Sequence, residues 1–386
     1  EYFYDKTFME KLNDKKNLLG FENGIYDLER SEFREGVPDD YVSISTGLTL
    51  PVINSSLPIK MHDILEEVQE IPNYDELQSG LDDFLEKVFP LDEVREYTLR
   101  FLSSCLSGEI REEKFYFWTG SGGNGKSKLV ELIDFAFGDY SRSMDVAYLT
   151  TKRGSSSAAS PELESIKNAR FVSMSEPEKS DQIYVGKLKQ MTGGDKMTTR
   201  GLFKETTQFK PQFKIVLMCN DLPTLQGNDG GIWRRIEVVK YMAKFTDAPR
   251  PSPADPYQYL ADEQLSSKLD SWKLLFIIKL LNKYIIYNKE GTCPPNAVKD
   301  ETSLYRTAND LIANWMVDDI TECDEFTSFD DLYDAWDRWC DDEGYNAKQR
   351  PEKKELKTYL ISQQEKTHYG CLFGKKKSDG CPNGTK

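Results

Sequence analysis

The sequence predicts an α/β protein in which a parallel sheet covered by helices forms the central domain, with smaller modules before and after it. Between residues 114 and 244, apolar strand-like segments alternate with helical ones, which is typical of a parallel sheet. The segment GSGGNGKS at residues 120–127 separates one such strand from one such helix. A length of 386 residues exceeds what one compact core usually holds, so we expect two or three domains.

The composition is that of an ordinary soluble protein, with 38% hydrophobic and 12% aromatic residues. The most apolar stretch, residues 272–287, is interrupted by Lys279, Asn282 and Lys283, so we expect a buried helix and no membrane span. The chain starts with EYFYDK, without Met or a signal peptide pattern, which is consistent with an excised fragment of an intracellular protein. Seven scattered cysteines and two histidines predict neither a zinc site nor a disulfide framework.

Charge is distributed unevenly along the chain. The net charge of −15 argues against a polyanionic partner, but the acidic segment at residues 318–343 alone carries −11 of it. Residues 187–214 instead hold seven bases and two acids. We therefore expect a basic island in an acidic protein, at a position where it could meet nucleic acid.

The predicted elements divide the chain into five segments. Residues 1–75 form a module of short strands and turns in which Asn23-Gly24 predicts a hairpin. Residues 76–112 have the apolar spacing of packing helices, and residues 113–248 hold the alternating core. The proline-rich segment 249–256 begins a linker and long helix over residues 249–300, and residues 301–386 form a small terminal domain.

The segment 120–127 has the pattern Gly-x4-Gly-Lys-Ser between a strand (115–118) and a helix (129–137). Glycines allow backbone amides to surround phosphates, and the helix dipole adds positive potential. Lys126 is expected to neutralise the β- and γ-phosphates of ATP, and Ser127 to hold Mg²⁺. A glycine-rich surface loop is the alternative. The predicted nucleotide-binding residues are Gly120, Gly122, Gly123, Asn124, Gly125, Lys126, Ser127 and Lys128.

Two further strands end in polar side chains suited to hydrolysis. The apolar segment ARFVSMSEPE places Glu176 where a strand should leave the carboxyl edge of the sheet, with Glu178 a weaker candidate. Glu176 is expected to hold the metal and polarise water. Asn220 follows the strand FKIVLMCN and could orient that water, or it could cap a turn. A solvated loop acid is the alternative interpretation of both carboxylates.

Two adjacent arginines, Arg234 and Arg235, lie at one end of the strand in NDGGIWRRIEVVKY. Neighbours on a strand point to opposite faces, so at most one can reach a given phosphate. We expect Arg234 to act as an arginine finger on nucleotide held by a neighbouring copy of the chain. Surface ion pairing is the alternative, and it is expected for the other arginine.

The segment MTTRGLFKETTQF (197–209) predicts a β-hairpin with Arg200, Phe203 and Lys204 near its tip and Lys196 at its periphery. Bases and one aromatic ring suit contacts with the phosphates and bases of a single strand, whereas an ordinary charged hairpin is the alternative. In the terminal domain, Ser328 is a plausible N-cap of a helix with a buried aromatic stripe. The opposite, acidic face is expected to be solvated.

These motifs, in this order, resemble the superfamily 3 helicases of AAA+ type, and among them the poxvirus-type primase-helicases of nucleocytoplasmic large DNA viruses and related phages. GSGGNGKS, ARFVSMSEPE, LKQMTGGDKMTTRGLFK, IVLMCN and GIWRRI carry the resemblance. Residues 18–41 resemble the module that precedes these helicases, and residues 326–346 resemble their winged-helix-like terminal domain.

The resemblance implies an AAA+ P-loop core that assembles as a homo-hexamer, binds ATP between subunits and moves on single-stranded DNA. It also implies replication in the host cytoplasm beside primase or polymerase partners. A primase active site in this chain is not expected, because His62 and His368 lack clustered carboxylates. The alternative function is an ATP-gated DNA-binding or loading platform that does not unwind. A small-molecule kinase is disfavoured, since a monomeric enzyme needs neither a basic hairpin nor a trans-acting arginine.

Overall fold

The computed structural model describes residues 8–52, 56–151, 161–177, 182–200, 206–226, 230–322, 328–345, 350–366 and 375–377. The chain forms two compact units. The first comprises Glu1–Pro223 and Arg234–Thr302, and the second comprises Thr224–Trp233 and Ser303–Lys386. The two units are described separately below.

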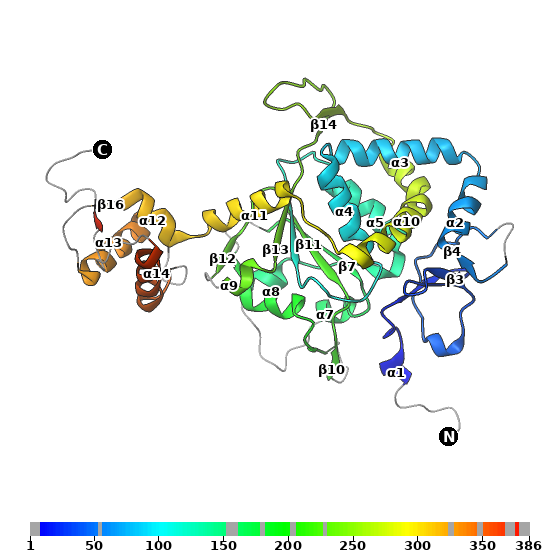
Figure 1. The fold of residues 1–386 in the computed structure, drawn as a ribbon, viewed down its shortest axis with the longest axis horizontal. Helices are drawn as coiled ribbons and strands as arrows, with labels where there is room; N and C mark the ends of the chain where they lie inside the picture. The colour runs from blue at the N-terminus through cyan, green and yellow to red at the C-terminus, as the bar shows by residue number, and fades with distance from the viewer. Residues whose placement is uncertain are drawn as a thin grey trace. The chain divides into compact units, whose positions relative to one another are not determined.

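A five-stranded sheet is the centre of the first unit (Figure 1). Its strand order is β13-β5-β11-β7-β6 and every neighbouring pair is parallel, which confirms the predicted fold class. The central position of β11, between β5 and β7, places the ends of these three strands side by side. The strands are β5 (Phe115–Thr119), β6 (Ser141–Ser143), β7 (Phe171–Ser175), β11 (Lys214–Cys219) and β13 (Ile236–Lys240).

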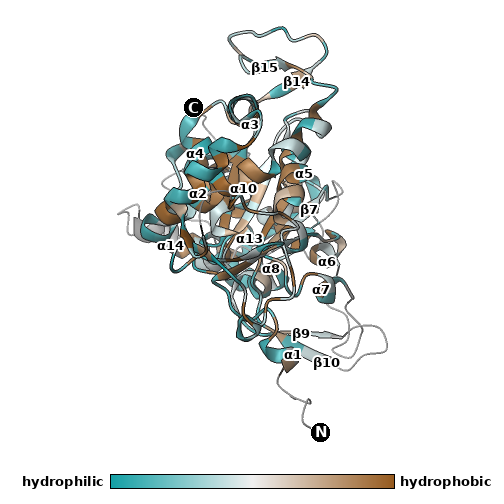
Figure 2. Cartoon of the chain, turned by 90° about the vertical axis from the view of Figure 1, so that its right-hand side faces the viewer, coloured by the Kyte–Doolittle hydropathy of each residue, from teal (hydrophilic) through white to brown (hydrophobic). Residues whose placement is uncertain are grey.

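Helices cover the sheet because its strands are apolar on both faces. In β5, Tyr116 and Trp118 pack into one core with the helices α3, α4, α5 and α10, while Phe115 and Phe117 are buried on the other side. Figure 2 shows the hydrophobic residues concentrated along α5 and α10. Lys279 and Lys283 of α10 pair with carboxylates of α3 and α4, which explains how this buried helix carries charge. The helices are α3 (Tyr74–Val88), α4 (Asp92–Ser104), α5 (Lys126–Phe137) and α10 (Leu265–Glu290).

A second sheet, ordered β1-β2-β3-β4, is built from the first sixty residues. The Asn23-Gly24 turn joins β1 and β2 as an antiparallel hairpin, as predicted. Buried polar contacts fix this module to the core: Arg170 donates to the carbonyls of Leu18 and Leu106, and the Tyr140 hydroxyl accepts from the Gly20 N–H at 2.9 Å. The elements are α1 (Phe8–Lys11), β1 (Leu18–Phe21), β2 (Gly24–Asp27), β3 (Glu32–Arg34), η1 (Pro38–Asp40), β4 (Ile59–Lys60), α2 (Met61–Glu67) and η2 (Val68–Glu70).

Two β-ribbons extend from the first unit. The hairpin of β9 and β10 precedes the amino end of β11 in the chain, whereas β14 and β15 follow the carboxyl end of β13. Figures 1 and 2 place these ribbons at opposite ends of the unit. The remaining elements are η3 (Gly138–Tyr140), α6 (Ala147–Thr150), α7 (Pro161–Ser165), β8 (Gln182–Tyr184), α8 (Val185–Thr192), β9 (Met197–Arg200), β10 (Thr206–Phe209), β14 (Lys244–Thr246) and β15 (Gln258–Leu260).

The second unit has a small helical core around Trp315 and Trp336. Ser328 accepts a hydrogen bond from the Asp331 N–H at 3.1 Å, which confirms it as the N-cap of α13. The predicted stripe faces this core: Leu332 and Trp336 are buried in it, and the half-buried rings of Phe329, Tyr333 and Trp339 pack against it. The elements are β12 (Thr224–Gln226), α9 (Gly230–Trp233), α11 (Asn296–Ala308, which begins in the first unit), α12 (Leu311–Asp319), β16 (Ile320–Glu322), α13 (Phe329–Asp342), α14 (Lys353–Lys366) and β17 (Lys375–Lys377).

Candidate nucleotide site

The ends of three adjacent strands form the candidate site. The loop 120–127 follows β5, Asn220 follows β11, and Glu176 follows β7. Because the strands are parallel and in register, these three segments share the carboxyl edge of the sheet. Ligands bind at this edge in open parallel sheets. The structure therefore brings together the predicted phosphate loop, acid and amide.

The loop 120–127 adopts a conformation that only glycine takes without strain at several positions. Gly122, Gly123 and Gly125 have φ values of 90°, 62° and 84°, in the left-handed region. A side chain at Gly125 would also meet Val88 at 2.9 Å and the Phe245 ring at 3.2 Å. The loop then passes directly into α5, whose first turn leaves backbone N–H groups without helical acceptors. These groups are available to an anion.

Lys126 is a buried cation at the start of α5, with 8% of the residue exposed. Its Nζ donates to the Gly120 carbonyl at 3.0 Å and to Asn124 Oδ1 at 3.2 Å, and no carboxylate pairs with it among the described residues. Burial lowers the pKa of Lys126, and the nearby Cys219 and Glu176 side chains partly offset that effect. An ammonium has three donors, so one remains for a further acceptor. A phosphate oxygen would supply the missing negative charge.

The other side chains of the loop differ in their roles. Ser127 is exposed in the first turn of α5. Lys128 instead pairs with Glu131 at 2.8 Å and donates to Ser266 Oγ at 2.6 Å, so its charge is engaged within the chain. Asn124 turns inward and is 3% exposed. Contact of Asn124 with a phosphate would therefore come from its backbone and not from its side chain.

Glu176 lies one residue beyond β7 with φ at 43°, an uncommon left-handed conformation for a residue with a side chain. Its N–H donates to the Met218 carbonyl at 2.9 Å, which fixes it beside the end of β11. Glu176 is exposed, and its charge is near enough to Lys126 to act on the pKa of that lysine. Strained backbone of this kind persists where surrounding contacts hold it, often at functional sites. The weaker candidate Glu178 lies outside the described residues.

Asn220 is exposed directly after β11, and its carbonyl accepts a hydrogen bond from Thr119 Oγ1 at 3.0 Å. Thr119 is the last residue of β5, before the phosphate loop. This bond connects the end of the central strand to the start of the loop. With Ser127 and Glu176, the edge offers a hydroxyl and a carboxylate as Mg²⁺ ligands and an amide to orient water.

The two arginines lie at the other edge of the sheet. They directly precede β13, whose first residue pairs with Phe115 at the start of β5. The five residues of β5 span roughly 16 Å at about 3.3 Å per residue, which separates both arginines from the phosphate loop of their own chain. Arg235 is mostly buried and pairs with Glu113 at 2.7 Å. Arg234 is exposed and shows no ion pair with any described residue.

The basic island is less exposed than its sequence indicates. The hairpin pairs Arg200 with Thr206, and Lys196 is exposed beside it. Phe203 and Lys204 lie outside the described residues, as does the Arg200 side chain. Lys187 and Lys214 are buried and donate to backbone carbonyls, so their charges do not reach nucleic acid. Two of the seven bases in the predicted basic island therefore lie inside the fold, because a long side chain can also form hydrogen bonds there.

The sequence did not indicate that Ala243 and Phe245 support the loop. Asn124 Nδ2 donates to the Ala243 carbonyl at 2.5 Å, and the Phe245 N–H donates to the Gly123 carbonyl at 2.7 Å. Both bonds join the phosphate loop to the segment that leaves β13. No local pattern in the sequence distinguishes these contacts, since they depend on β13 lying beside β5 in the sheet.

Comparison with known proteins finds relatives in large DNA viruses. A protein of Acanthamoeba polyphaga mimivirus named "Putative helicase" is 39% identical over 366 residues, covering 92% of this chain and 36% of the relative. A protein of Invertebrate iridescent virus 3, also named as a "Putative helicase", is 27% identical, covering 88% of this chain and 36% of the relative. The chain is a homologue of these viral proteins. A protein of African swine fever virus named "Putative primase" is 23% identical, over 83% of this chain and 32% of its own length.

Two family descriptions match segments of this chain. Residues 6–90 match "D5 N terminal like", and residues 118–235 match "Family of unknown function (DUF5906)". The chain spans about a third of the length of the curated relatives. Among solved structures, the apo NrS-1 C-terminal region aligns at 14% identity and a TM-score of 0.44, over 77% of this chain and 67% of that one.

None of the helices in the described ranges combines the length and the apolar character that a bilayer crossing needs. Within the same residues, no group of three or more His, Cys, Asp and Glu side chains is placed to hold a metal ion.

Proposed function

We propose that the chain is the ATP-hydrolysing core of a superfamily 3 replicative DNA helicase. The observation that carries the proposal is the shared carboxyl edge at which the phosphate loop, Asn220 and Glu176 meet, with the buried Lys126 behind the loop. ATP would bind with its phosphates on the loop. Mg²⁺ would be held by Ser127 and Glu176 and would neutralise charge on the phosphates.

The position of Arg234 supports an assembly in which subunits complete one another's sites. An exposed arginine at the opposite sheet edge cannot stabilise charge on nucleotide bound by its own loop, but it can reach nucleotide on a neighbouring copy. A closed ring presents every copy with such a neighbour. We propose a homo-hexamer of this kind, as the resemblance to superfamily 3 helicases implies.

Strand β11 offers a direct route from nucleotide to DNA. Its amino end follows the β9–β10 hairpin, and its carboxyl end carries Asn220 at the nucleotide site. β11 is hydrogen-bonded to neighbours on both sides, so it connects the two ends rigidly, and we propose that a change at Asn220 is transmitted along it to the hairpin. The hairpin, with Lys196 beside it, would grip single-stranded DNA, and primase or polymerase proteins would be partners in replication.

Strand separation on a forked DNA duplex tests the proposal. The wild-type chain should hydrolyse ATP faster with single-stranded DNA present and should release the labelled strand. Lys126→Ala should lose both activities, because it removes the cation behind the loop, whereas Lys196→Ala should keep basal turnover. ATP turnover without strand release would replace the helicase by an ATP-gated loading platform. If an assembled ring hydrolysed no ATP in the presence of DNA, both the helicase and the loading platform would be refuted.

A further inference from the structure

Thr119 is the last residue of β5, directly before the phosphate loop, and it bonds to the ends of both neighbouring strands. Its hydroxyl donates to the Asn220 carbonyl after β11 at 3.0 Å, and its carbonyl accepts from the Tyr241 N–H after β13 at 2.7 Å. The sheet register places Thr119 opposite Cys219 on one side and Lys240 on the other, so each bond reaches one residue beyond its strand. With 9% of Thr119 exposed, the hydroxyl has little access to water.

A short series of bonds joins Asn220 to Lys126 through Thr119. Gly120 follows Thr119 in the chain, and its carbonyl accepts from Lys126 Nζ at 3.0 Å. The Asn220 backbone is thus separated from the lysine by two hydrogen bonds and two adjacent residues. Burial raises the pKa of the Cys219 thiol to about 11, whereas Lys126 and the Thr119 hydroxyl both lower it, so these three groups are neighbours.

The Thr119 hydroxyl holds Asn220 at a point where the sheet no longer does. The pairing of β11 with β5 ends at Cys219, one residue before Asn220. Asn220 is exposed, so burial does not fix it either. In the proposed function, Lys126 neutralises the phosphates and Asn220 orients the attacking water. The two side chains must therefore be placed together, and an error of about 1 Å in such a site can cost roughly 100-fold in rate.

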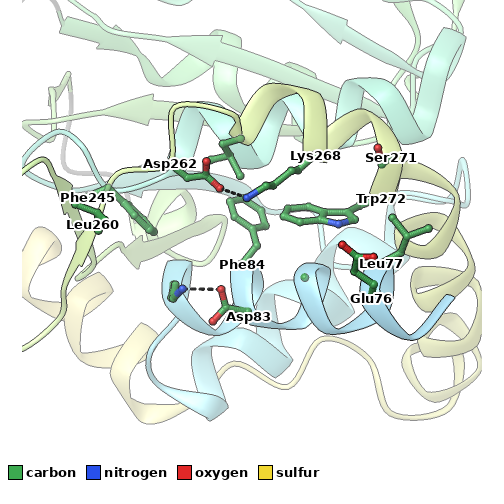
Figure 3. A pocket seen from close by; sticks show the side chains of 13 residues that line it. Glu76, Leu77, Asp83, Phe84, Phe245, Leu260, Asp262, Lys268, Ser271 and Trp272 are labelled. Carbon is green, nitrogen blue, oxygen red and sulfur yellow. Dashed lines mark hydrogen bonds and ion pairs between the residues drawn. The ribbon is translucent and has the colours of Figure 1, made fainter. Parts of the chain in front are cut away.

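Other contacts hold the rest of the phosphate loop. The Phe245 N–H donates to the Gly123 carbonyl at 2.7 Å, and Asn124 Nδ2 donates to the Ala243 carbonyl at 2.5 Å. The Phe245 side chain is itself placed among those of α3 and α10, where it lines a cavity together with Trp272 (Figure 3). Removal of the Thr119 hydroxyl should therefore leave the loop, and its affinity for phosphates, in place.

We propose that Thr119 is a positioning residue for ATP hydrolysis, whose hydroxyl holds Asn220 in the correct place relative to Lys126. The inference rests on the proposed function, since it requires that the loop bind ATP and that Asn220 orient water. Thr119 acts through Asn220 and not on the nucleotide. Its hydroxyl therefore contributes to the rate of the chemical step and not to ATP affinity.

Two substitutions of Thr119 and one control test this role in the assembled chain. Thr119→Val removes the hydroxyl and keeps the β-branched shape, whereas Thr119→Ser keeps the hydroxyl. Thr98→Val is the matched control, because it removes another buried hydroxyl, which donates to the Val94 carbonyl within α4 at 2.8 Å. Calorimetry measures ATP affinity, and phosphate release with single-stranded DNA present measures kcat.

Thr119→Val should lower kcat roughly 10- to 100-fold and keep the ATP Kd within about twofold of wild type. Thr119→Ser and Thr98→Val should keep kcat within about threefold. Wild-type kcat in Thr119→Val would overturn the inference and leave the proposed function intact. A loss of ATP affinity as large as the loss of kcat would also overturn it, because the hydroxyl would then support the loop. A wild-type ring that neither binds nor hydrolyses ATP would overturn the proposed function as well.

A double-mutant cycle with Asn220→Ala shows whether Thr119 acts through Asn220. Rates are measured over a single turnover, so that slow hydrolysis is still detected. Once the Asn220 amide is absent, Thr119→Val should lower the rate by less than about twofold further. The same 10- to 100-fold loss in both backgrounds would contradict a positioning role, because Thr119 would then act independently of Asn220.

Discussion

Asn124→Ala tests whether the phosphate loop is held from within the fold. The Asn124 side chain donates to the Ala243 carbonyl at 2.5 Å and accepts from Lys126 Nζ at 3.2 Å. Alanine leaves a buried carbonyl without its donor, at a cost of about 1–3 kcal/mol, and removes a hydrogen bond worth about 1 kcal/mol. We therefore expect a loss of about 2–4 kcal/mol in the free energy of unfolding of the first unit.

Urea unfolding followed by far-UV circular dichroism measures this loss. Asn282→Ala, an exposed asparagine of α10, is the control and should stay within about 0.5 kcal/mol of wild type. Asn124→Asp distinguishes the two bonds. It keeps an acceptor for Lys126 but places a carboxylate against the Ala243 carbonyl, so we expect it to be no more stable than Asn124→Ala. A stability of Asn124→Ala within 0.5 kcal/mol of wild type would refute the reasoning.

Four further outcomes are expected. Glu176→Gln should bind ATP but hydrolyse it poorly in a phosphate-release assay, and wild-type turnover would place the metal ligand elsewhere. Arg234→Ala should keep ATP affinity but lower turnover of the assembled ring roughly 10³–10⁵-fold, and turnover like the wild type would mean that another residue is the finger. Lys204→Ala should reduce the stimulation of ATP turnover by single-stranded DNA and spare basal turnover, so an unchanged stimulation ratio would argue against the hairpin. Burial lowers the pKa of Lys214 to about 8 from 10.5, so the unfolded chain binds more protons between these values and stability should rise with pH across that window. Denaturation from pH 8 to 10.5 should show the wild type gaining up to about 3 kcal/mol relative to Lys214→Met, and a constant difference would contradict a desolvated lysine.

Much of the fold could be predicted from the sequence because its signals are local. Strand and helix periods, the Asn23-Gly24 turn and the Ser328 cap each depend on a few neighbouring residues, and the structure has all of them. The phosphate loop was visible for the same reason, since its glycines and Lys126 occur within eight consecutive residues. Glu176 and Asn220 could be chosen because an apolar strand precedes each one.

Contacts between distant segments could not be predicted. Lys187 and Lys214 look like members of a basic surface in sequence, but each donates hydrogen bonds to backbone carbonyls far away along the chain. Asn124 looks like a nucleotide ligand because of its position in the loop. Its side chain instead donates a hydrogen bond to the Ala243 carbonyl, in the segment after β13. In both cases the choice between solvent and a buried partner depends on which strands become neighbours.

The sequence alone determined the strands, helices and phosphate loop of an α/β protein and their order along the chain. The alternation of strands and helices, the spacing of the loop glycines and the polar residues after the strands each depend on neighbouring residues only. Tertiary structure decided which parts cooperate. The strand order brings Asn220 between Glu176 and the phosphate loop and places Arg234 at the opposite edge. The physical reason is that a parallel sheet brings the ends of strands that are distant in the sequence to the same edge. The local sequence shows only which residues precede and follow each strand.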